Sequence, residues 1–474
     1  MSKALLVAGM VIALVLVGVV GVVILRPPQA LIRDAGFSVD IITPNADGED
    51  DIAVFSYDLA RNAKVSLSFE REDGSIYVFR TNEQRSGPQH YSVNFSGVVD
   101  GFSLPDDGDL QANIERRLIP DGRYTWTFVA ENEDERETET GTLVIMGGDT
   151  QLPLINAFDL SSDYFTPNQD GVRDRVTISI YLAKEADLQV YLQDAEGVKY
   201  FVSEVELGRN PGEAGNHQFD YDGGVDDGFE PPADGDYTLY AVAQDAVGQR
   251  VVRTATFAIQ DGGLPQAEIA TQVVGSLVCF SVLPWDERYA STRELQGDII
   301  DIPESNCADQ TKLVMEQGDL LAFRLTVLNY GDTPIRTAGP FPGAVYSFEQ
   351  LYNSLGELQK PGTFRVGVHC DTVITDHPWR WGIASPDELV EVFDPQLDDT
   401  FYYLEPDEGA VVWGAIRMTE IYDEQNPQNC YASLIHEGVR IVQRAVGSRS
   451  VEILPRSLED TTAEAPAAPV FPIG

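Results

Sequence analysis

Basic side chains are scarce in this sequence. Lysine and arginine together number 32 against 76 aspartate and glutamate residues, so the formal net charge at pH 7 is −44. A surface this acidic repels nucleic acid and anionic lipid headgroups, because both carry negative charge. The composition therefore excludes nucleic acid as a partner, and it favours cations, basic proteins or a saline exterior.

Catalytic signatures are also missing. The chain has no Gly-x-Ser-x-Gly turn, no phosphate-binding loop and no Cys-x-x-Cys pair. His436-Glu437 lacks the rest of a zinc-protease helix motif. The histidines are scattered, at His90, His217, His369, His377 and His436. We therefore expect a protein that is not an enzyme.

Cysteine is rare, and all four residues lie in the C-terminal half, at Cys279, Cys307, Cys370 and Cys430. An even number in a β-rich region suggests two disulfides formed in an oxidising compartment. Four buried free thiols are the alternative. Joining neighbours in sequence predicts the pairs Cys279–Cys307 and Cys370–Cys430.

Long helical patterns are absent except at the N-terminus. Ala4 to Leu25 is an unbroken run of 22 apolar or glycine residues, which as a helix would span about 33 Å, enough for the hydrocarbon core of a membrane. We expect residues 1–27 to be a transmembrane anchor that binds the membrane through residues 4–25. A cleaved signal peptide is the alternative, but its apolar region is usually shorter. The predicted location is the cytoplasmic membrane, single-pass, with the C-terminal region extracellular or periplasmic.

An internal repeat is the most informative feature that is present. Thr43–Asp51 (TPNADGEDD) recurs as Thr166–Asp174 (TPNQDGVRD), an offset of 166 − 43 = 123. The Asp-Gly-x-Tyr segments at 121–124 and 234–237 recur at an offset of 234 − 121 = 113, so copy one carries a net insertion of 123 − 113 = 10 residues. We place this insertion within Phe102–Leu118.

Period-two alternation of apolar and polar residues predicts strands throughout. Val65, Leu67 and Phe69 alternate with polar residues in copy one, as expected for strands with one buried face. The predicted fold is all-β, with an N-terminal transmembrane helix followed by tandem immunoglobulin-like β-sandwich domains. We expect a linker over 28–36, module 1 over 37–147, module 2 over 154–261, a third and larger sandwich over 264–455, and a disordered tail over 456–474.

The repeated motifs are similar to a known family. Pro-Asn-x-Asp-Gly-x-x-Asp followed by strands and Asp-Gly-x-Tyr, over residues 37–260, resembles the FlgD-type Ig-like repeat of bacterial surface and secreted proteins. This resemblance implies a sandwich fold and does not imply a role in flagellar hook capping. In the third domain, Asn329-Tyr330-Gly331 and the later Leu404-Glu405-Pro406 resemble a motif of bacterial adhesion-type Ig-like domains.

The repeated acidic loop is the sharpest chemical feature. Its oxygen donors suit calcium, which takes six to eight oxygen ligands. The candidate ligands are Asn45, Asp47 and Asp51 in copy one and Asn168, Asp170 and Asp174 in copy two. Each loop follows the junction that precedes its module, so an ion there would stiffen that junction. Asx-turns without an ion are the alternative, and Asp222, Asp226 and Asp227 form a further oxygen-rich loop.

The third domain is the expected interaction domain, because it holds all the cysteines and most of the tryptophans. Trp379 and Trp381 lie on one side of a strand or loop, where two rings can stack on a sugar or a partner's arginine. Core packing is the alternative for both rings. The sequence thus predicts a membrane-anchored extracytoplasmic structural and binding protein, an Ig-like rod whose third domain binds a protein or glycan. A filament or surface-layer subunit and a carbohydrate-binding surface module are the alternatives.

Overall fold

The structure, a computed structural model, describes residues 30–456 except for 106, 109, 207, 209, 272–275, 287–310, 356 and 357. In this part of the chain the regular elements are strands and short 3-10 helices, which confirms the predicted all-β class. The chain divides into two compact units. The first comprises the described residues up to Ser161 with Thr177–Asp220 and Asp236–Phe257, and the second comprises Ser162–Val176, Tyr221–Gly235 and the described residues from Ala258 onward.

The structure corrects the prediction of a single-pass protein in the cytoplasmic membrane. No helix among the described residues is long and apolar enough to cross a bilayer. The anchor predicted over 1–27, including the apolar run 4–25, lies outside the described residues, as does the predicted tail from residue 457 onward.

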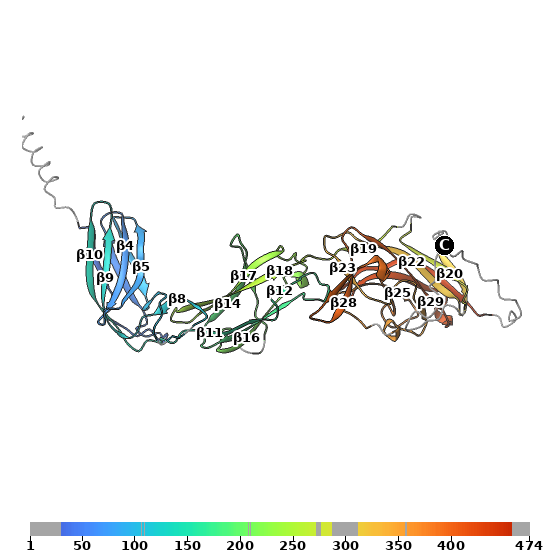
Figure 1. Cartoon of the computed structure of the whole chain (residues 1–474), viewed down its shortest axis with the longest axis horizontal. Helices are drawn as coiled ribbons and strands as arrows, with labels where there is room; N and C mark the ends of the chain where they lie inside the picture. Colours follow the sequence, from blue (N-terminus) through green and yellow to red (C-terminus); the bar gives the residue numbers. More distant parts are fainter. Residues whose placement is uncertain are drawn as a thin grey trace, which may run out of the picture. The chain divides into compact units, whose positions relative to one another are not determined.

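Module 1 is a sandwich of two sheets. Its strands are β1 (Ile32–Phe37), β2 (Ile41–Ile42), β3 (Ala53–Leu59), β4 (Ala63–Arg71), β5 (Ile76–Arg85), β6 (Gln89–Phe95), β9 (Gly122–Glu131) and β10 (Arg136–Ile145). One sheet has the order β1-β3-β6, and the other has the order β2-β10-β9-β4-β5, of which β10, β9, β4 and β5 are labelled in Figure 1. Strand β1 begins at Ile32, inside the linker that was predicted over 28–36.

The core of module 1 follows from the period-two pattern. Val65, Leu67 and Phe69 of β4 are buried, as predicted. The ring of Phe69 stacks on Phe95 with centroids 4.4 Å apart, and Trp126 packs edge-on against other rings of the cluster. Burial of each such ring contributes on the order of 2–3 kcal/mol to the stability of the sandwich.

The ten-residue insertion of copy one forms part of an added hairpin. Strands β7 (Val98–Asp100) and β8 (Asn113–Leu118) pair with each other antiparallel. Strand β8 then pairs with β18 (Arg250–Ile259) of module 2, with Ile114 opposite Val251. The insertion therefore extends the sheet of the following module.

Module 2 repeats the topology of module 1. Its other elements are β11 (Ile155–Leu160), β12 (Tyr164–Phe165), β13 (Val176–Leu182), β14 (Asp187–Gln193), β15 (Lys199–Val202), β16 (Gly215–Tyr221), η1 (Val225–Asp227) and β17 (Gly235–Gln244). One sheet has the order β11-β13-β16, and the other has the order β15-β14-β17-β18-β8-β7 with β12 paired to β18. Strands β1, β2 and β3 thus correspond to β11, β12 and β13.

The third domain has two larger sheets. Its strands are β19 (Ala267–Ala270), β20 (Val278–Leu283), β21 (Lys312–Glu316), β22 (Leu320–Asn329), β23 (Ile335–Thr337), β24 (Val345–Ser347), β25 (Phe364–Cys370), β26 (Trp379–Gly382), β27 (Val390–Asp394), β28 (Asp399–Leu404), β29 (Gly409–Arg417), β30 (Gln428–His436) and β31 (Arg440–Leu454). The 3-10 helices are η3 (Tyr352–Leu355), η4 (Pro386–Glu388) and η5 (Asp423–Gln425).

One sheet of the third domain has the order β19-β22-β29-β24, with β20 paired to β22. The other has the order β21-β31-β30-β25-β23-β28-β27, with β26 paired to β25. Strand β27 is therefore an edge strand. The motif halves resembling adhesion-type domains meet in this fold, because the buried Asn329 side chain donates to the Leu404 carbonyl at 3.1 Å.

Candidate functional site at the acidic loops

The first acidic loop is closed by its own carboxylates. The carboxylate of Asp51 accepts hydrogen bonds from the backbone N–H groups of Asn45 (2.9 Å), Ala46 (2.8 Å) and Gly48 (2.7 Å). Asp47 accepts from the N–H of Glu49 at 2.8 Å. Gly48 has φ +90°, a left-handed conformation that glycine adopts without steric cost.

The second acidic loop has closely similar internal bonds, with the N–H of Asp170 in place of the one equivalent to Ala46. Asp174 accepts from the N–H groups of Asn168 (3.3 Å), Asp170 (3.1 Å) and Gly171 (2.5 Å). Asp170 accepts from the N–H of Val172 at 2.7 Å. The bonds that the two copies share are those of nested Asx-turns.

Both loops lie at the end of the module where the chain leaves it. Strands β2 and β12 run parallel to the last strands, β10 and β18, and carry the loop to that end. The carbonyl of Pro44 accepts from the N–H of Asp149 at 2.9 Å, and that of Pro167 accepts from Gly263 at 3.1 Å. The expectation that each loop stiffens the junction before its module is therefore wrong, because the loop contacts the junction after it.

The aspartate of the Asp-Gly-x-Tyr motif holds the same segment. Asp121 accepts from the N–H groups of Gly147 (2.7 Å) and Gly148 (3.1 Å). In module 2, Asp234 accepts from those of Asp261 (2.9 Å) and Gly262 (3.0 Å). The two repeated sequence motifs thus act on one structural element, the segment that leads out of each module.

The two loops differ in their surroundings. Asn45 and Asp47 are exposed, whereas Asn168 and Asp170 are each only 5% exposed. The second loop is covered by the third domain within the second compact unit. Tyr403 of β28 donates its hydroxyl to Asp170 at 2.8 Å.

Further contacts attach the second loop to the third domain. The Nε2 atom of His436 donates to the Gln169 carbonyl at 2.8 Å. Arg173 pairs with Asp394 and donates to Gln396 Oε1 at 2.7 Å. Sequence reasoning missed these partners, because they lie more than 200 positions from the loop and no local pattern marks them.

The pKa values of the equivalent aspartates Asp51 and Asp174 shift in opposite directions. Burial, and then the neighbouring Asp170 carboxylate, raise the pKa of Asp174 to about 6. Burial also raises the pKa of Asp51, but its three N–H donors together outweigh that effect, so the net shift is downward. Burial lowers the pKa of His436 to about 4, which keeps the imidazole neutral at pH 7.

The calcium assignment of the two loops stays a prediction. Among the described residues no group of three or more His, Cys, Asp or Glu side chains is arranged to hold a metal ion. In the further acidic loop, Asp222 accepts from the N–H groups of Gly224 and Asp226, and Asp226 pairs with Arg175. Hydrogen bonds within the protein therefore engage the carboxylates of both kinds of loop.

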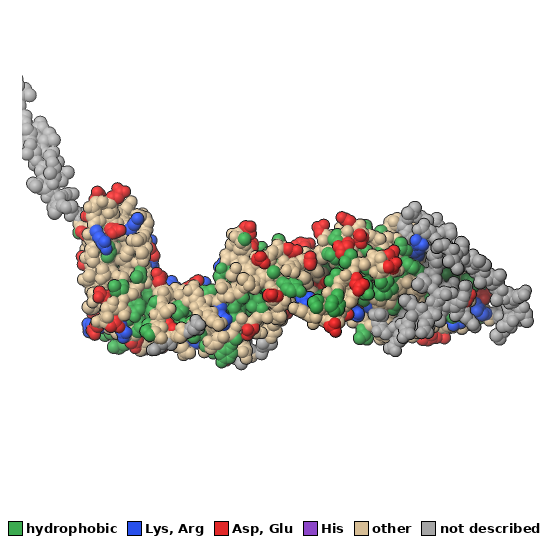
Figure 2. All heavy atoms as spheres, viewed as in Figure 1, with side chains coloured by type: hydrophobic (Ala, Val, Ile, Leu, Met, Phe, Trp, Pro, Cys, Tyr) green, Lys and Arg blue, Asp and Glu red, His purple; other side chains and the backbone are tan. Residues whose placement is uncertain are grey.

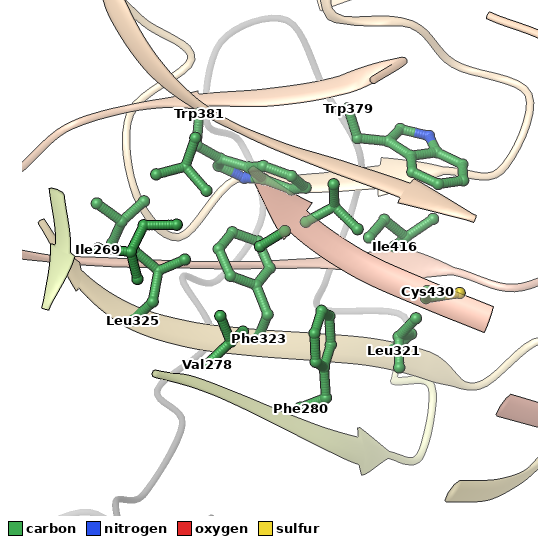
Figure 3. Packing of buried hydrophobic residues seen from close by; sticks show 14 of the residues in the cluster. Ile269, Val278, Phe280, Leu321, Phe323, Leu325, Trp379, Trp381, Ile416 and Cys430 are labelled. Atoms are coloured by element: carbon green, nitrogen blue, oxygen red, sulfur yellow. The ribbon is translucent and has the colours of Figure 1, made fainter. Parts of the chain in front are cut away.

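The tryptophans predicted to bind a ligand are core residues. Trp379 and Trp381 are fully buried. Figure 3 shows Trp381 beside Phe323, and the two ring centroids are 4.6 Å apart. The Trp381 indole N–H donates to the Ala344 carbonyl at 2.9 Å. The assignment of these rings to glycan or partner binding is corrected, because neither ring presents a face to solvent.

One predicted disulfide is confirmed. Cys370 of β25 and Cys430 of β30 occupy paired positions on neighbouring strands and are bonded. Cys279 is also disulfide-bonded, and its predicted partner Cys307 lies outside the described residues.

A Ser-His-Asp alignment in the third domain was not predicted from the sequence. Ser433 Oγ lies 2.8 Å from His377 Nε2, and His377 Nδ1 lies 2.8 Å from the Asp376 carboxylate. Ser433 and His377 are fully buried, however, and Ser433 also accepts from the N–H of Ala445. A nucleophile must reach its substrate, and in this structure neither Ser433 nor His377 is accessible to one.

A cleft of about 540 Å³ adjoins the second loop. Its walls come from β12, the loop itself and the β27–β28 hairpin, all within the second compact unit. Aromatic rings and carboxylates dominate the lining, which includes Tyr164, Phe401, Tyr403, Asp261, Phe393 and Glu405.

Comparisons with known proteins give distant similarities. No family model matches the chain, and no curated protein matches it significantly. The chain is similar to a tetra-tandem repeat in the extending region of a large adhesion protein, at 11% identity over 88% of this chain and 73% of that chain, with a TM-score of 0.18. It is similar to the three N-terminal domains of the bacteriophage RB49 Highly Immunogenic Outer Capsid protein, at 8% identity over 89% of this chain and 99% of that chain, with a TM-score of 0.21.

A third similarity is to a chimeric titin Z1Z2 functionalised with an exogenous KLER peptide from decorin. Identity is 17% over 48% of this chain and 96% of that chain, with a TM-score of 0.16. Similarities at these TM-scores carry no argument about function, and the FlgD-type assignment stays a prediction. The sheet topology by itself shows tandem β-sandwich domains.

Proposed function

We propose that this chain is an extracellular structural and binding protein. Modules 1 and 2 act as spacers, and the third domain carries the binding surface. The observation that supports the proposal is the repeated fastening of the segment that leaves each module, by a proline carbonyl and an aspartate carboxylate at equivalent positions. A chain that only connected independent domains would not need such fastening.

Each junction is reinforced by contacts to the following domain. At the first, β8 adds to the sheet of module 2, and the buried Gln249 donates to the carbonyls of Asp149 (3.1 Å) and Gln151 (2.9 Å). At the second, Tyr403, His436 and Asp394 hold the acidic loop. These bonds resist bending, as a spacer requires.

The disulfide supports a location outside the cytoplasm. Disulfides persist in oxidising compartments and are rare in the cytosol, and Cys370–Cys430 joins two central strands. A non-catalytic role is part of the proposal, since the Ser433–His377 pair is buried.

Small-angle X-ray scattering of the full chain tests the spacer role. A single globule of this length would have a radius of gyration of about 23 Å. We expect a clearly larger value, and we expect it to rise no further when salt is lowered, since the junctions are bonded. A radius near that of the globule would contradict the proposal.

A further inference from the structure

Strand β27 leaves one edge of a large sheet open. It pairs with β28 through Val390 opposite Tyr403 to Asp394 opposite Asp399, in unbroken antiparallel register. Among the described residues, no strand pairs with its other side. An edge of this kind presents N–H and C=O groups that can pair with another chain.

The edge is mainly apolar and carries no lysine, proline or bulge. Val390, Val392 and Phe393 are 45%, 44% and 58% exposed. Proteins usually protect an open edge with charged side chains, proline or a bulge, whereas β27 reads Val-Glu-Val-Phe-Asp, has Glu391 as its one exposed charge and has no register shift. An unblocked apolar edge strand fits a docking site for an extended segment.

The cleft beside this edge is lined by more acidic than basic side chains. Val392 and Phe393 line it, together with the carboxylates of Asp261 and Glu405. Its one lining arginine, Arg173, is already neutralised by Asp394. Arg173 and Arg336 already lie over the rings of Tyr164 and Phe401. The carboxylates of Asp261 and Glu405 would attract a lysine or arginine side chain that enters the cleft.

The charge of the whole chain points to the same class of partner. The net charge is −44, and Figure 2 shows many more acidic than basic side chains on the visible face. Two copies of this chain would repel each other at such an edge, whereas a basic protein would be attracted. The chain itself already uses strand addition at the β8–β18 pair.

We propose that β27 binds an extended basic segment of a partner protein by strand addition, with a lysine or arginine of that segment in the adjoining cleft. The inference rests on the proposed function and names the partner class and the docking strand of the third domain. Apolar residues of the segment would cover Val392 and Phe393, while its backbone extends the sheet.

Fluorescence anisotropy of the full chain with labelled synthetic peptides tests this. The probes are (Lys-Val)5, (Glu-Val)5 and (Lys-Ser)5 in about 0.15 M salt, where long-range attraction is screened. We expect (Lys-Val)5 to bind, and both other peptides to bind about tenfold more weakly or not at all, because each lacks one of the two required features.

Two variants of equal charge locate the site. Val392→Lys should weaken (Lys-Val)5 binding by about tenfold or more. Phe201→Lys is the control, since Phe201 is an exposed aromatic residue on the edge strand β15 of module 2, and it should leave binding unchanged. The double variant Asp261→Asn, Glu405→Gln should weaken the binding of (Lys-Val)5 and should not allow (Glu-Val)5 to bind.

Several outcomes would overturn the inference. One is that (Lys-Val)5 binds the wild type and Val392→Lys equally well. Another is that Phe201→Lys weakens peptide binding as much as Val392→Lys does. A third is that the wild-type chain forms dimers in sedimentation experiments and Val392→Lys abolishes them, which would make a second copy of the chain the occupant of the edge. Phe393→Thr serves as a second edge variant if Val392→Lys melts early. The radius of gyration reports on the spacer role independently of these binding results.

Discussion

At the residue scale, the aspartates at one equivalent position of the two repeats, Asp51 and Asp174, differ in their pKa shifts. Asp51 and Asp174 close equivalent loops and each accepts three N–H bonds, two of them from equivalent residues. Their pKa values move in opposite directions, because the third domain covers only the second loop. The side chain and its local bonds are set by the motif, whereas its protonation is set by burial.

This difference predicts opposite pH dependence for Asp174→Asn and Asp51→Asn. Asp174 has a folded pKa of about 6 against an unfolded value of 3.8, so the folded chain binds more protons in that window and wild-type stability rises as pH falls through it. The free-energy cost of Asp174→Asn should therefore grow between pH 7 and pH 4, by at most about 3 kcal/mol.

For Asp51→Asn, the free-energy cost should change with pH in the opposite direction. Its folded pKa lies below 3.8, so its contribution to stability is lost as pH falls below that value, and the cost of Asp51→Asn should shrink there. Urea denaturation of both variants and the wild type, from pH 3 to pH 7, measures the differences. His436 also contributes to the pH dependence of stability, with the opposite sign to Asp174, because its folded pKa is lowered to about 4. This contribution is common to the wild type and both variants, so it cancels when their free energies of unfolding are subtracted. Parallel trends for the two variants would refute the assignment.

The burial of Trp381 gives a second prediction at this scale. Trp381→Ala should cost about 3–5 kcal/mol, because it removes a fully buried ring and leaves a cavity. Tyr330→Ala is the exposed control in the same domain and should change stability by less than about 0.5 kcal/mol. Thermal denaturation compares the two, and equal midpoints would place Trp381 outside the core.

At the element scale, the β7–β8 hairpin belongs to module 1 in sequence and to the sheet of module 2 in space. Its pairing with β18 supplies backbone hydrogen bonds across the first junction. A strand shared in this way limits independent motion of the two modules, since bending the junction would break the ladder.

Ile114→Pro should weaken this ladder, because proline removes an N–H donor and fixes φ. We expect faster proteolytic cleavage in the segment 147–153, by several-fold, with little change in the melting of the module cores. Ile76→Pro is the control, since Ile76 is the first residue of the edge strand β5, where proline is tolerated. Unchanged cleavage in Ile114→Pro would mean that the pairing does not restrain the junction.

The disulfide Cys370–Cys430 is a covalent link between two strands of the third domain. It closes a separation of 60 residues between β25 and β30, for which chain-entropy arguments give about 4 kcal/mol. Replacing Cys370 and Cys430 together by serine should lower the melting temperature of the third domain, and chemical reductant should then have a smaller additional effect than on the wild type. A double variant that melts like the wild type would show that the bond does not form in solution.

At the scale of the whole molecule, self-repulsion from the net charge of −44 opposes the compact state. Salt should therefore raise the melting temperature by screening. If the first loop binds calcium, 1 mM CaCl2 should add roughly 0.4–1.4 kcal/mol beyond NaCl of equal ionic strength. Asp47→Ala should abolish the additional stabilisation by CaCl2 and leave the stabilisation by NaCl unchanged. Equal effects of the two salts on the wild type would leave the loop as an Asx-turn.

The sequence by itself determined the features that depend on near neighbours. The alternation at Val65, Leu67 and Phe69 specified a strand with one buried face, because side chains alternate along any strand. The internal bonds of the acidic loops span at most six positions, so the sequence could offer Asx-turn geometry as the alternative to a calcium site. The Cys370–Cys430 pair also followed from the sequence, as one of a few possible connectivities.

Only the tertiary structure decided which of these features meet. The contacts of Asp170 with Tyr403 and of Gln169 with His436 join residues 233 and 267 positions apart, and no local pattern encodes such a distance. Burial is likewise a property of the packed chain, which is why Trp379 and Trp381 pointed to a ligand in sequence and proved to be core. For the same reason, identical loops became an exposed turn in module 1 and a buried junction in module 2.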